Sequence, residues 1–178
     1  MHRPAVCTVR IAPEIIMTRS DRARLEGLLR EHEPIRSWKA VAFLVGEMAR
    51  ARLVDDDEIG PTVVTIHSRV AFREDSDGDA MVATLTLPGE RGLYQDAMSV
   101  LTASGAALLG LSEGQSITFV APDGRKRTIA VDKVLYQPQA ARAREGYRGR
   151  RSAGRVDDCN RRAIQAYRRR GSGPAAQH

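Results

Sequence analysis

The hydrophobic pattern of the chain changes at Gly60–Pro61, and this change limits what the chain can fold into. Before this pair, apolar residues recur every three or four positions, which is typical of amphipathic helices. After it, Val, Ile and Phe stand in short runs between turn residues, which is typical of strands. A Gly–Pro pair interrupts both kinds of element. The sequence therefore predicts an α+β protein with a helical part followed by a sheet part.

Two helices are predicted before this boundary. The first covers residues 19–32, with leucines at helical spacing, and the second runs from Trp38 to Leu53 after Ser37, which can cap it. Pro34 lies between them, so residues 18–58 are expected to form a short antiparallel helical hairpin, or coiled coil. The apolar stripe of the second helix is predicted to hold Trp38, Val41, Val45, Met48 and Arg52.

Residues 59–139 are predicted to form one small domain, a curved antiparallel sheet with a short helix. Asp77–Gly78 and Pro122–Asp123–Gly124 are turn signals between apolar runs, so each is expected to join two strands of a hairpin. The small residues from Ala103 to Leu109 are expected to form the helix. Residues 1–17 are interpreted as a leader.

Charge is distributed unevenly along the chain. Residues 140–178 hold eleven arginines and three acids, a net charge of +8, whereas the whole chain carries +6, so residues 1–139 carry −2. Because it has few large apolar residues, this C-terminal tail is expected to be mostly disordered. An idle solvated extension and a phosphate-binding tail are both open interpretations. The candidate nucleic-acid contacts are Arg150, Arg151, Arg161, Arg162, Arg168, Arg169 and Arg170.

No sequence pattern predicts catalysis or a metal centre. Gly-x-Ser-x-Gly, a P-loop and His-Glu-x-x-His are absent. The two cysteines, Cys7 and Cys159, and the four scattered histidines lack zinc-site spacing. We therefore expect no catalytic residues, no metal and no cofactor. No apolar run approaches the ~20 residues that span a bilayer, so we expect a cytoplasmic monomer without membrane contact.

Three acidic segments need separate interpretation. Residues 55–58 are all acidic and could hold a divalent cation or form a solvated linker at a helix end. Residues 75–79 resemble the start of a calcium loop, but position twelve would be Thr86, so a hairpin turn is favoured. Glu31 and Glu33 flank the predicted tip of the helical hairpin. They fit an exposed turn, or a contact point for a metal or for basic groups.

A family resemblance is carried by several stretches of the second half. They are Asp96–Val100, Gly105–Leu111, Glu113–Ile117, Pro122–Gly124, Val134–Pro138 and Val63–Val70. As a set they resemble the C-terminal domain of the Gre transcription elongation factors, which has an FKBP-like fold. The stretch Val63–Val70 and the stretch Asp75–Gly78 after it look closest to the Rnk subgroup, called regulators of nucleoside diphosphate kinase. The resemblance covers residues 14–140 and excludes the tail.

The resemblance implies a function in transcription. Gre factors bind at the mouth of the RNA polymerase secondary channel, and their long coiled coil carries acidic tip residues to the active site for RNA cleavage. Here the second helix would span only about 24 Å at ~1.5 Å per residue, so Glu31 and Glu33 should not reach that site. The expected function is therefore polymerase binding in competition with Gre factors, without stimulated cleavage.

The polymerase-facing segment of Gre factors, typically Asp-Ser-Pro, corresponds to Leu101, Thr102 and Ala103, of which only Thr102 keeps its side-chain type. With Val100 and Gly105 beside them, these are the candidate polymerase contacts. Two other functions stay open. One is nucleic-acid binding through the arginine-rich tail. The other is peptidyl-prolyl isomerase activity, for which the predicted domain has few aromatic residues to line a proline pocket.

Overall fold

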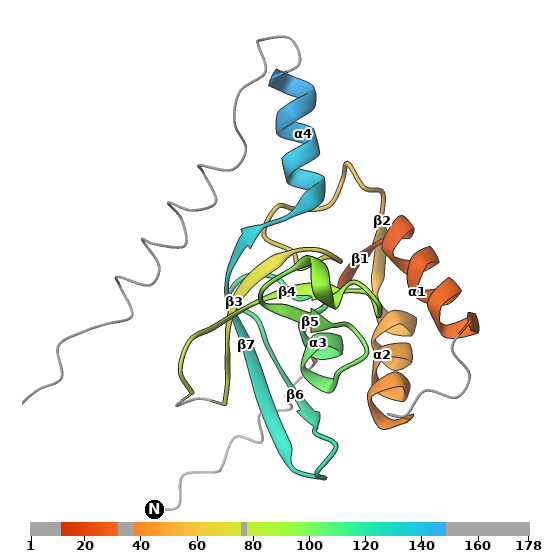
Figure 1. Ribbon diagram of the computed structural model, residues 1–178, viewed down its shortest axis with the longest axis vertical. Helices are drawn as coiled ribbons and strands as arrows, with labels where there is room; N and C mark the ends of the chain where they lie inside the picture. Colours follow the sequence, from red (N-terminus) through yellow and green to blue (C-terminus); the bar gives the residue numbers. More distant parts are fainter. Residues whose placement is uncertain (1–11, 32–37, 76–77, 149–178) are drawn as a thin grey trace, which may run out of the picture.

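A sheet with helices beside it forms the body of the protein (Figure 1). The structure is a computed structural model, and it describes residues 12–31, 38–75 and 78–148. The α4 helix leaves the body at the end opposite the tip of the β6–β7 hairpin. The elements in chain order are β1 (Ile16–Thr18), α1 (Arg19–Glu31), α2 (Trp38–Arg50), β2 (Arg52–Val54), β3 (Arg69–Glu74), β4 (Met81–Thr86), η1 (Arg91–Leu93), β5 (Ala97–Ser99), α3 (Ala103–Leu108), β6 (Ser116–Val120), β7 (Lys126–Tyr136) and α4 (Pro138–Arg148).

The main sheet has five strands in the order β5-β4-β3-β7-β6. Strands β3 and β4, and strands β6 and β7, pair as the antiparallel hairpins that the turn residues predict. The sheet is mixed rather than purely antiparallel, because β5 pairs parallel with β4. Residues 87–96, including η1, carry the chain back before β5 begins, so both strands run in the same direction.

A second, two-stranded sheet joins the ends of the helical region. Strand β1 pairs parallel with β2, and α1 and α2 lie between these two strands in the sequence. Ile15 and Met17 are buried, and the Ile16 N–H donates to the carbonyl oxygen of Gly110 at 3.1 Å. Residues 12–17 are therefore part of the body, and the interpretation of residues 1–17 as a leader is wrong for them. Residues 1–11 lie outside the described part of the chain.

Both predicted helices are present, but α2 is rotated and shorter than expected. It ends at Arg50, and Leu53 belongs to β2. Its buried apolar positions are Ala40, Leu44 and Met48, whereas Val45 is 46% exposed. The predicted stripe is right at Met48 and wrong at Val45, because α2 packs against α3, a helix of small residues, and this contact selects the face that is buried.

One hydrophobic core joins the helical region to the main sheet. It contains Leu25 of α1, Leu44 of α2, Phe72 of β3, Leu108 of α3 and Ile129 of β7. The core therefore crosses the domain boundary expected at residue 59. The protein is α+β as predicted, while the coiled coil and the FKBP-like assignment stay predictions.

The chain continues as a helix beyond the expected end of the folded part. Helix α4 includes residues 140–148, which the sequence pattern places in the tail. Its first turn is held because the Gln137 amide donates to the carbonyl oxygens of Gly60 and Val63, each at 2.8 Å. Residues 149–178 lie outside the described part of the chain. None of the described helices is long and apolar enough to cross a membrane.

Candidate docking site

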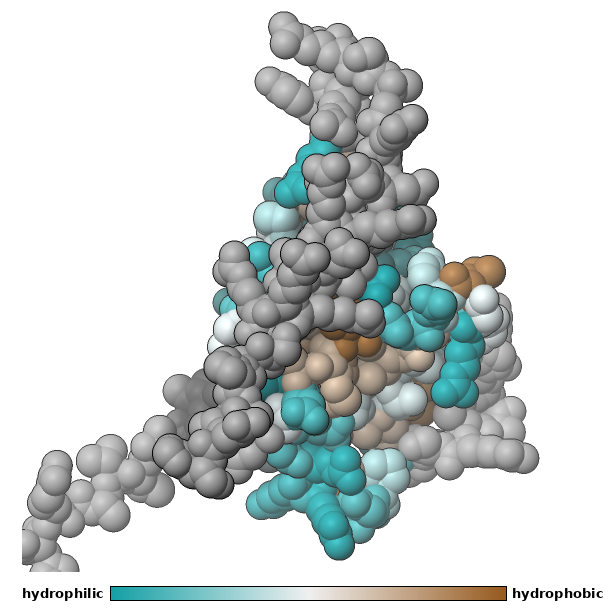
Figure 2. Space-filling view, turned by 60° about the vertical axis from the view of Figure 1, so that its left-hand side comes forward, coloured by the Kyte–Doolittle hydropathy of each residue, from teal (hydrophilic) through white to brown (hydrophobic). Residues whose placement is uncertain are grey.

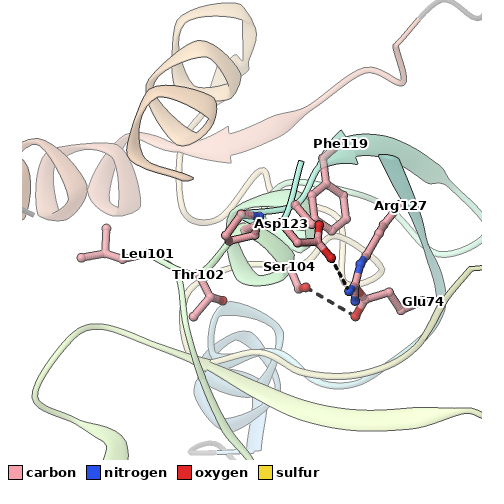
Figure 3. Close-up of a pocket in the computed structure, with 10 residues that line it drawn as sticks. Glu74, Leu101, Thr102, Ser104, Phe119, Asp123 and Arg127 are labelled. Atoms are coloured by element: carbon pink, nitrogen blue, oxygen red, sulfur yellow. Dashed lines mark hydrogen bonds and ion pairs between the residues drawn. The ribbon is translucent and has the colours of Figure 1, made fainter. Parts of the chain in front are cut away.

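A hollow of about 460 Å³ lies between the start of α3 and the β6–β7 hairpin (Figure 3). Residues 101–104 form one wall, and Phe119 with residues 121–123 forms the other. Glu74 and Arg127 close it from strands β3 and β7. Its volume is within the range of ligand pockets, and its lining is partly apolar and partly charged. Such a lining suits a protruding side chain of a protein partner.

The charged wall of the hollow is a hydrogen-bonded cluster around Arg127. Its guanidinium donates to Glu74 Oε1 at 3.0 Å and to Asp123 Oδ2 at 3.2 Å. The hydrogen bonds that Arg127 donates to Glu74 and to Asp123 raise the pKa of Arg127. The pKa of Asp123 is lowered most by the hydrogen bond that its carboxylate accepts from the Arg125 backbone N–H. The hydrogen bond from Arg127 lowers it further. Both shifts favour the charged forms of Asp123 and Arg127.

The tip of the β6–β7 hairpin is strongly hydrophilic. Asp123, Arg125 and Lys126 are exposed there, and Figure 2 shows this hydrophilic end at the bottom of the molecule with hydrophobic surface above it. Inside the hairpin, Phe119 of β6 is buried and faces Phe43 of α2 with ring centroids 6.2 Å apart. One wall of the hollow therefore rests on a helix of the N-terminal region.

The wall opposite the hairpin is a tightly fixed turn before α3. Thr102 Oγ1 accepts the Gly105 N–H at 3.0 Å and donates to the Ser99 carbonyl oxygen at 2.8 Å. Thr102 is therefore the N-cap of α3. A Cβ atom on Gly105 would lie 2.1 Å from that Ser99 oxygen, so only glycine fits at this position.

The five candidate contacts in this segment are not equally accessible. Leu101 is half-buried and Thr102 is exposed, and both line the hollow. Val100 and Gly105 are buried, and Ala103 is 9% exposed at the edge of the core. A partner can therefore touch Leu101 and Thr102, while Val100 and Gly105 shape the turn that presents them.

The other candidate residues do not come together with the hollow. Glu31 ends α1, with its side chain outside the described part, and Glu33 lies outside it altogether. The tail arginines, Arg150 to Arg170, also lie outside it.

The acidic run at residues 55–58 is tied to α1. Asp55 pairs with Arg19 at 3.0 Å, and Asp56 accepts the Ser20 hydroxyl at 2.6 Å. The described residues contain no group of three His, Cys, Asp or Glu side chains that could hold a metal ion.

Sequence reasoning missed the charged wall of the hollow. Glu74 and Arg127 lie 53 positions apart and meet because β3 and β7 pair in the sheet. For Asp123, the sequence predicts only a turn-forming role. In the sequence, Glu74 and Arg127 are recognisable only as opposite charges close to predicted turns. Such charges can be assigned to each other only when the pairing of the strands is known.

Two models of known protein families together match most of the described chain. Residues 57–136 match the family model "Transcription elongation factor, GreA/GreB, C-term", and residues 13–54 match "Rnk N-terminus". The regulator of nucleoside diphosphate kinase from Escherichia coli K12 is 38% identical over 130 residues, which cover 72% of this chain and 94% of that protein. The hollow lies within the GreA/GreB match.

Two further relatives are elongation factors. GreA of Desulfovibrio desulfuricans is 30% identical over 121 residues, covering 64% of this chain and 74% of that protein. A solved structure of a prokaryotic GreA/GreB elongation factor from Nitrosomonas europaea is 36% identical with a TM-score of 0.54, and covers 70% of this chain and 99% of that one. These relatives are named as regulators or elongation factors, which is consistent with a protein that is not an enzyme.

Proposed function

Because this chain belongs to the Rnk family, which shares its C-terminal half with the GreA/GreB factors, we propose that it is a transcription regulator that docks on RNA polymerase at the secondary channel. The family relationship by itself supports a regulator that resembles a transcription elongation factor. The specific partner and the docking position are our proposal. The observation that carries it is the turn at residues 101–104 beside the hollow.

The hollow gives this turn the properties of a docking site. Leu101 offers an apolar side chain and Thr102 an exposed hydroxyl-bearing position, both held in place by the Ser99–Thr102–Gly105 hydrogen bonds. A turn that is rigid before binding loses little conformational entropy when a partner docks. The apolar and charged walls beside it would accept a polymerase side chain and exclude water from the contact.

We also propose that the protein does not stimulate RNA cleavage. Helices α1 and α2 each contain 13 residues, so each is about 20 Å long at ~1.5 Å per residue. This is shorter than the length expected from sequence, because α2 ends at Arg50. A hairpin of this length would occupy the channel mouth without carrying acidic residues to the active centre. Its effect would be to compete with cleavage-stimulating Gre factors.

A binding experiment with core RNA polymerase tests the docking site. We expect Leu101→Glu to weaken binding at least ~10-fold, because a charge would be placed in an apolar contact. Leu93→Glu is the matched control, since Leu93 is 74% exposed on η1 and does not line the hollow. Both variants should first be shown to melt cooperatively. Equal binding by the two variants and the unchanged protein would contradict the docking site.

A cleavage assay tests the second part of the proposal. Backtracked elongation complexes incubated with the protein and magnesium should keep their transcript length, whereas a GreA factor should shorten it. Adding both proteins should slow the GreA reaction. Transcripts that are shortened by this protein alone, and no longer shortened by Glu31→Ala/Glu33→Ala, would overturn the proposal.

A further inference from the structure

Helix α4 lies beyond the GreA/GreB family match. The GreA/GreB match ends at residue 136, and α4 begins at Pro138. In Figure 1 this helix projects away from the sheet, on the side opposite the tip of the β6–β7 hairpin. Its function therefore has to be inferred from its own contacts and charges.

The first turn of α4 is fixed to the body by two buried glutamines. Gln137 is 3% exposed and donates to the carbonyl oxygens of Gly60 and Val63, while its Oε1 accepts the Ala140 N–H at 3.2 Å. Gln139 is 8% exposed and accepts the Thr65 hydroxyl at 2.9 Å. Buried amides are unfavourable unless they are hydrogen-bonded, so these bonds specify one position for the start of the helix. The helix is therefore a fixed projection of the body.

The exposed part of α4 carries positive charge. Arg142 and Arg144 are exposed, and no carboxylate among the described side chains forms an ion pair with either of them. Residues 140–148 hold three arginines and one glutamate, a net charge of +2, and the whole sequence from residue 140 onwards carries +8, whereas residues 1–139 carry −2. A polyanion would be repelled by the body and attracted to this segment.

We propose that α4 is a nucleic-acid-binding arm, which holds arginines in a fixed direction to contact the phosphate backbone of RNA or DNA. Arg142 and Arg144 are exposed on a projecting helix and do not line the hollow, which fits a long repeating anion better than a small one. The arm is independent of the hollow, so its binding does not depend on polymerase docking.

A salt titration of the full-length protein tests the arm. Arg142→Gln/Arg144→Gln should weaken binding to duplex DNA about fivefold at low salt and flatten the slope of log K against log salt by about 1.8, at ~0.9 per lost phosphate contact. The matched control is Arg91→Gln/Arg125→Gln, which removes two exposed arginines of the body. The control should keep the original slope. Equal losses in both variants, or no loss in the α4 variant, would overturn the proposal.

A second variant separates the helix from its charges. Ala143→Pro breaks α4 between the two arginines and keeps every charge, whereas Ala143→Ser keeps the helix. Weaker binding by the proline variant alone would support a positioned arm, and equal binding by both would overturn it. Parallel titrations with single-stranded RNA and duplex DNA identify the preferred nucleic acid. Tighter binding to vesicles of anionic phospholipid than to either nucleic acid would overturn the assignment.

Discussion

The arginines of the body and those of α4 are used in opposite ways. Many arginines of the body pair with carboxylates, some within one helix and some between elements, whereas Arg142 and Arg144 are exposed and form no ion pair with the described side chains. The paired arginines include Arg19, Arg22, Arg24, Arg50, Arg52, Arg69, Arg73 and Arg127. Much of the positive charge in the body is therefore used in ion pairs, whereas Arg142 and Arg144 on α4 are available to a ligand.

The largest expected effect lies in the body, at the turn before α3. Gly105→Ala should lower the free energy of unfolding by roughly 3 kcal/mol, because its Cβ would overlap the Ser99 carbonyl oxygen and force the turn apart. Gly46→Ala on α2 is the control, since nothing lies within 4 Å of the position that its Cβ would take and alanine favours a helix. Urea denaturation measures both. An unchanged unfolding free energy for Gly105→Ala would show that the turn is not rigid.

The junction between the two regions should be the next most sensitive place. Gln137→Ala leaves the Gly60 and Val63 carbonyl oxygens without this donor, and each buried unpaired group is destabilising by about 1–3 kcal/mol. We expect a loss of about 2 kcal/mol in thermal or urea unfolding. The exposed Gln95→Ala should have no effect. Equal stability of the two variants would mean that α4 is not anchored to the body.

Replacing one arginine from each region should change the free energy of unfolding by less than the two substitutions above. Arg69 donates to Asp96 at 2.6 Å, and its side chain is 23% exposed, so Arg69→Gln should destabilise the protein by about 1 kcal/mol. Arg144→Gln should change the unfolding free energy by less than about 0.3 kcal/mol. Both are measured by urea denaturation at low salt. A larger loss for Arg144→Gln would remove the distinction between structural and available arginines.

The smallest expected effect is on the pH dependence of stability, and it comes from Asp21 in the body. Asp21 is buried, and this burial raises its pKa above 3.8, although the Ile66 N–H and Arg24 act in the opposite direction. The folded state then holds this proton more tightly than the unfolded state. Its contribution to stability is complete below pH 3.8 and is lost as the pH rises through the raised pKa.

Asp21→Asn should remove this part of the pH dependence. The unfolding free energy of the variant should fall less steeply than that of the unchanged protein as the pH rises above 3.8. His67 and Asp56 also act on the Asp21 charge, so neither of them can serve as a control. The control is Asp57→Asn, an exposed residue of the same acidic run. Identical pH profiles for Asp21→Asn and the unchanged protein would contradict the prediction.

Local sequence signals predicted the elements better than the contacts between them. The α1 and α2 helices follow from apolar spacing, and the β6–β7 hairpin follows from Pro122–Asp123–Gly124. Strands β1 and β2 were missed, because three-residue strands have no period of their own and depend on a distant partner. Val45 was placed on the wrong face for the same reason, since α3 decides which side of α2 is buried.

The candidate docking site was predicted in part. The segment at residues 100–105 came from the family resemblance, and the structure adds that Leu101 and Thr102 are its accessible residues. Arg127 and Glu74 could not be assigned to it, because their contact depends on the pairing of β3 with β7. Helix α4 could not be separated from the tail because glutamines are usually surface residues, and only the folded structure shows their buried partners.

During synthesis, α1 and α2 are complete long before the residues that cover them. The hydrogen bond from the Ile16 N–H can form only after Gly110 has been synthesised, and α2 can pack against α3 only after α3 has been synthesised. Contacts between such distant parts of a chain form slowly, because the intervening loop has to close first. The core that encloses Leu25 and Leu44 is therefore incomplete while the sheet is still being made. A chain interrupted before α3 would present these apolar helix faces to other nascent chains, where they favour aggregation.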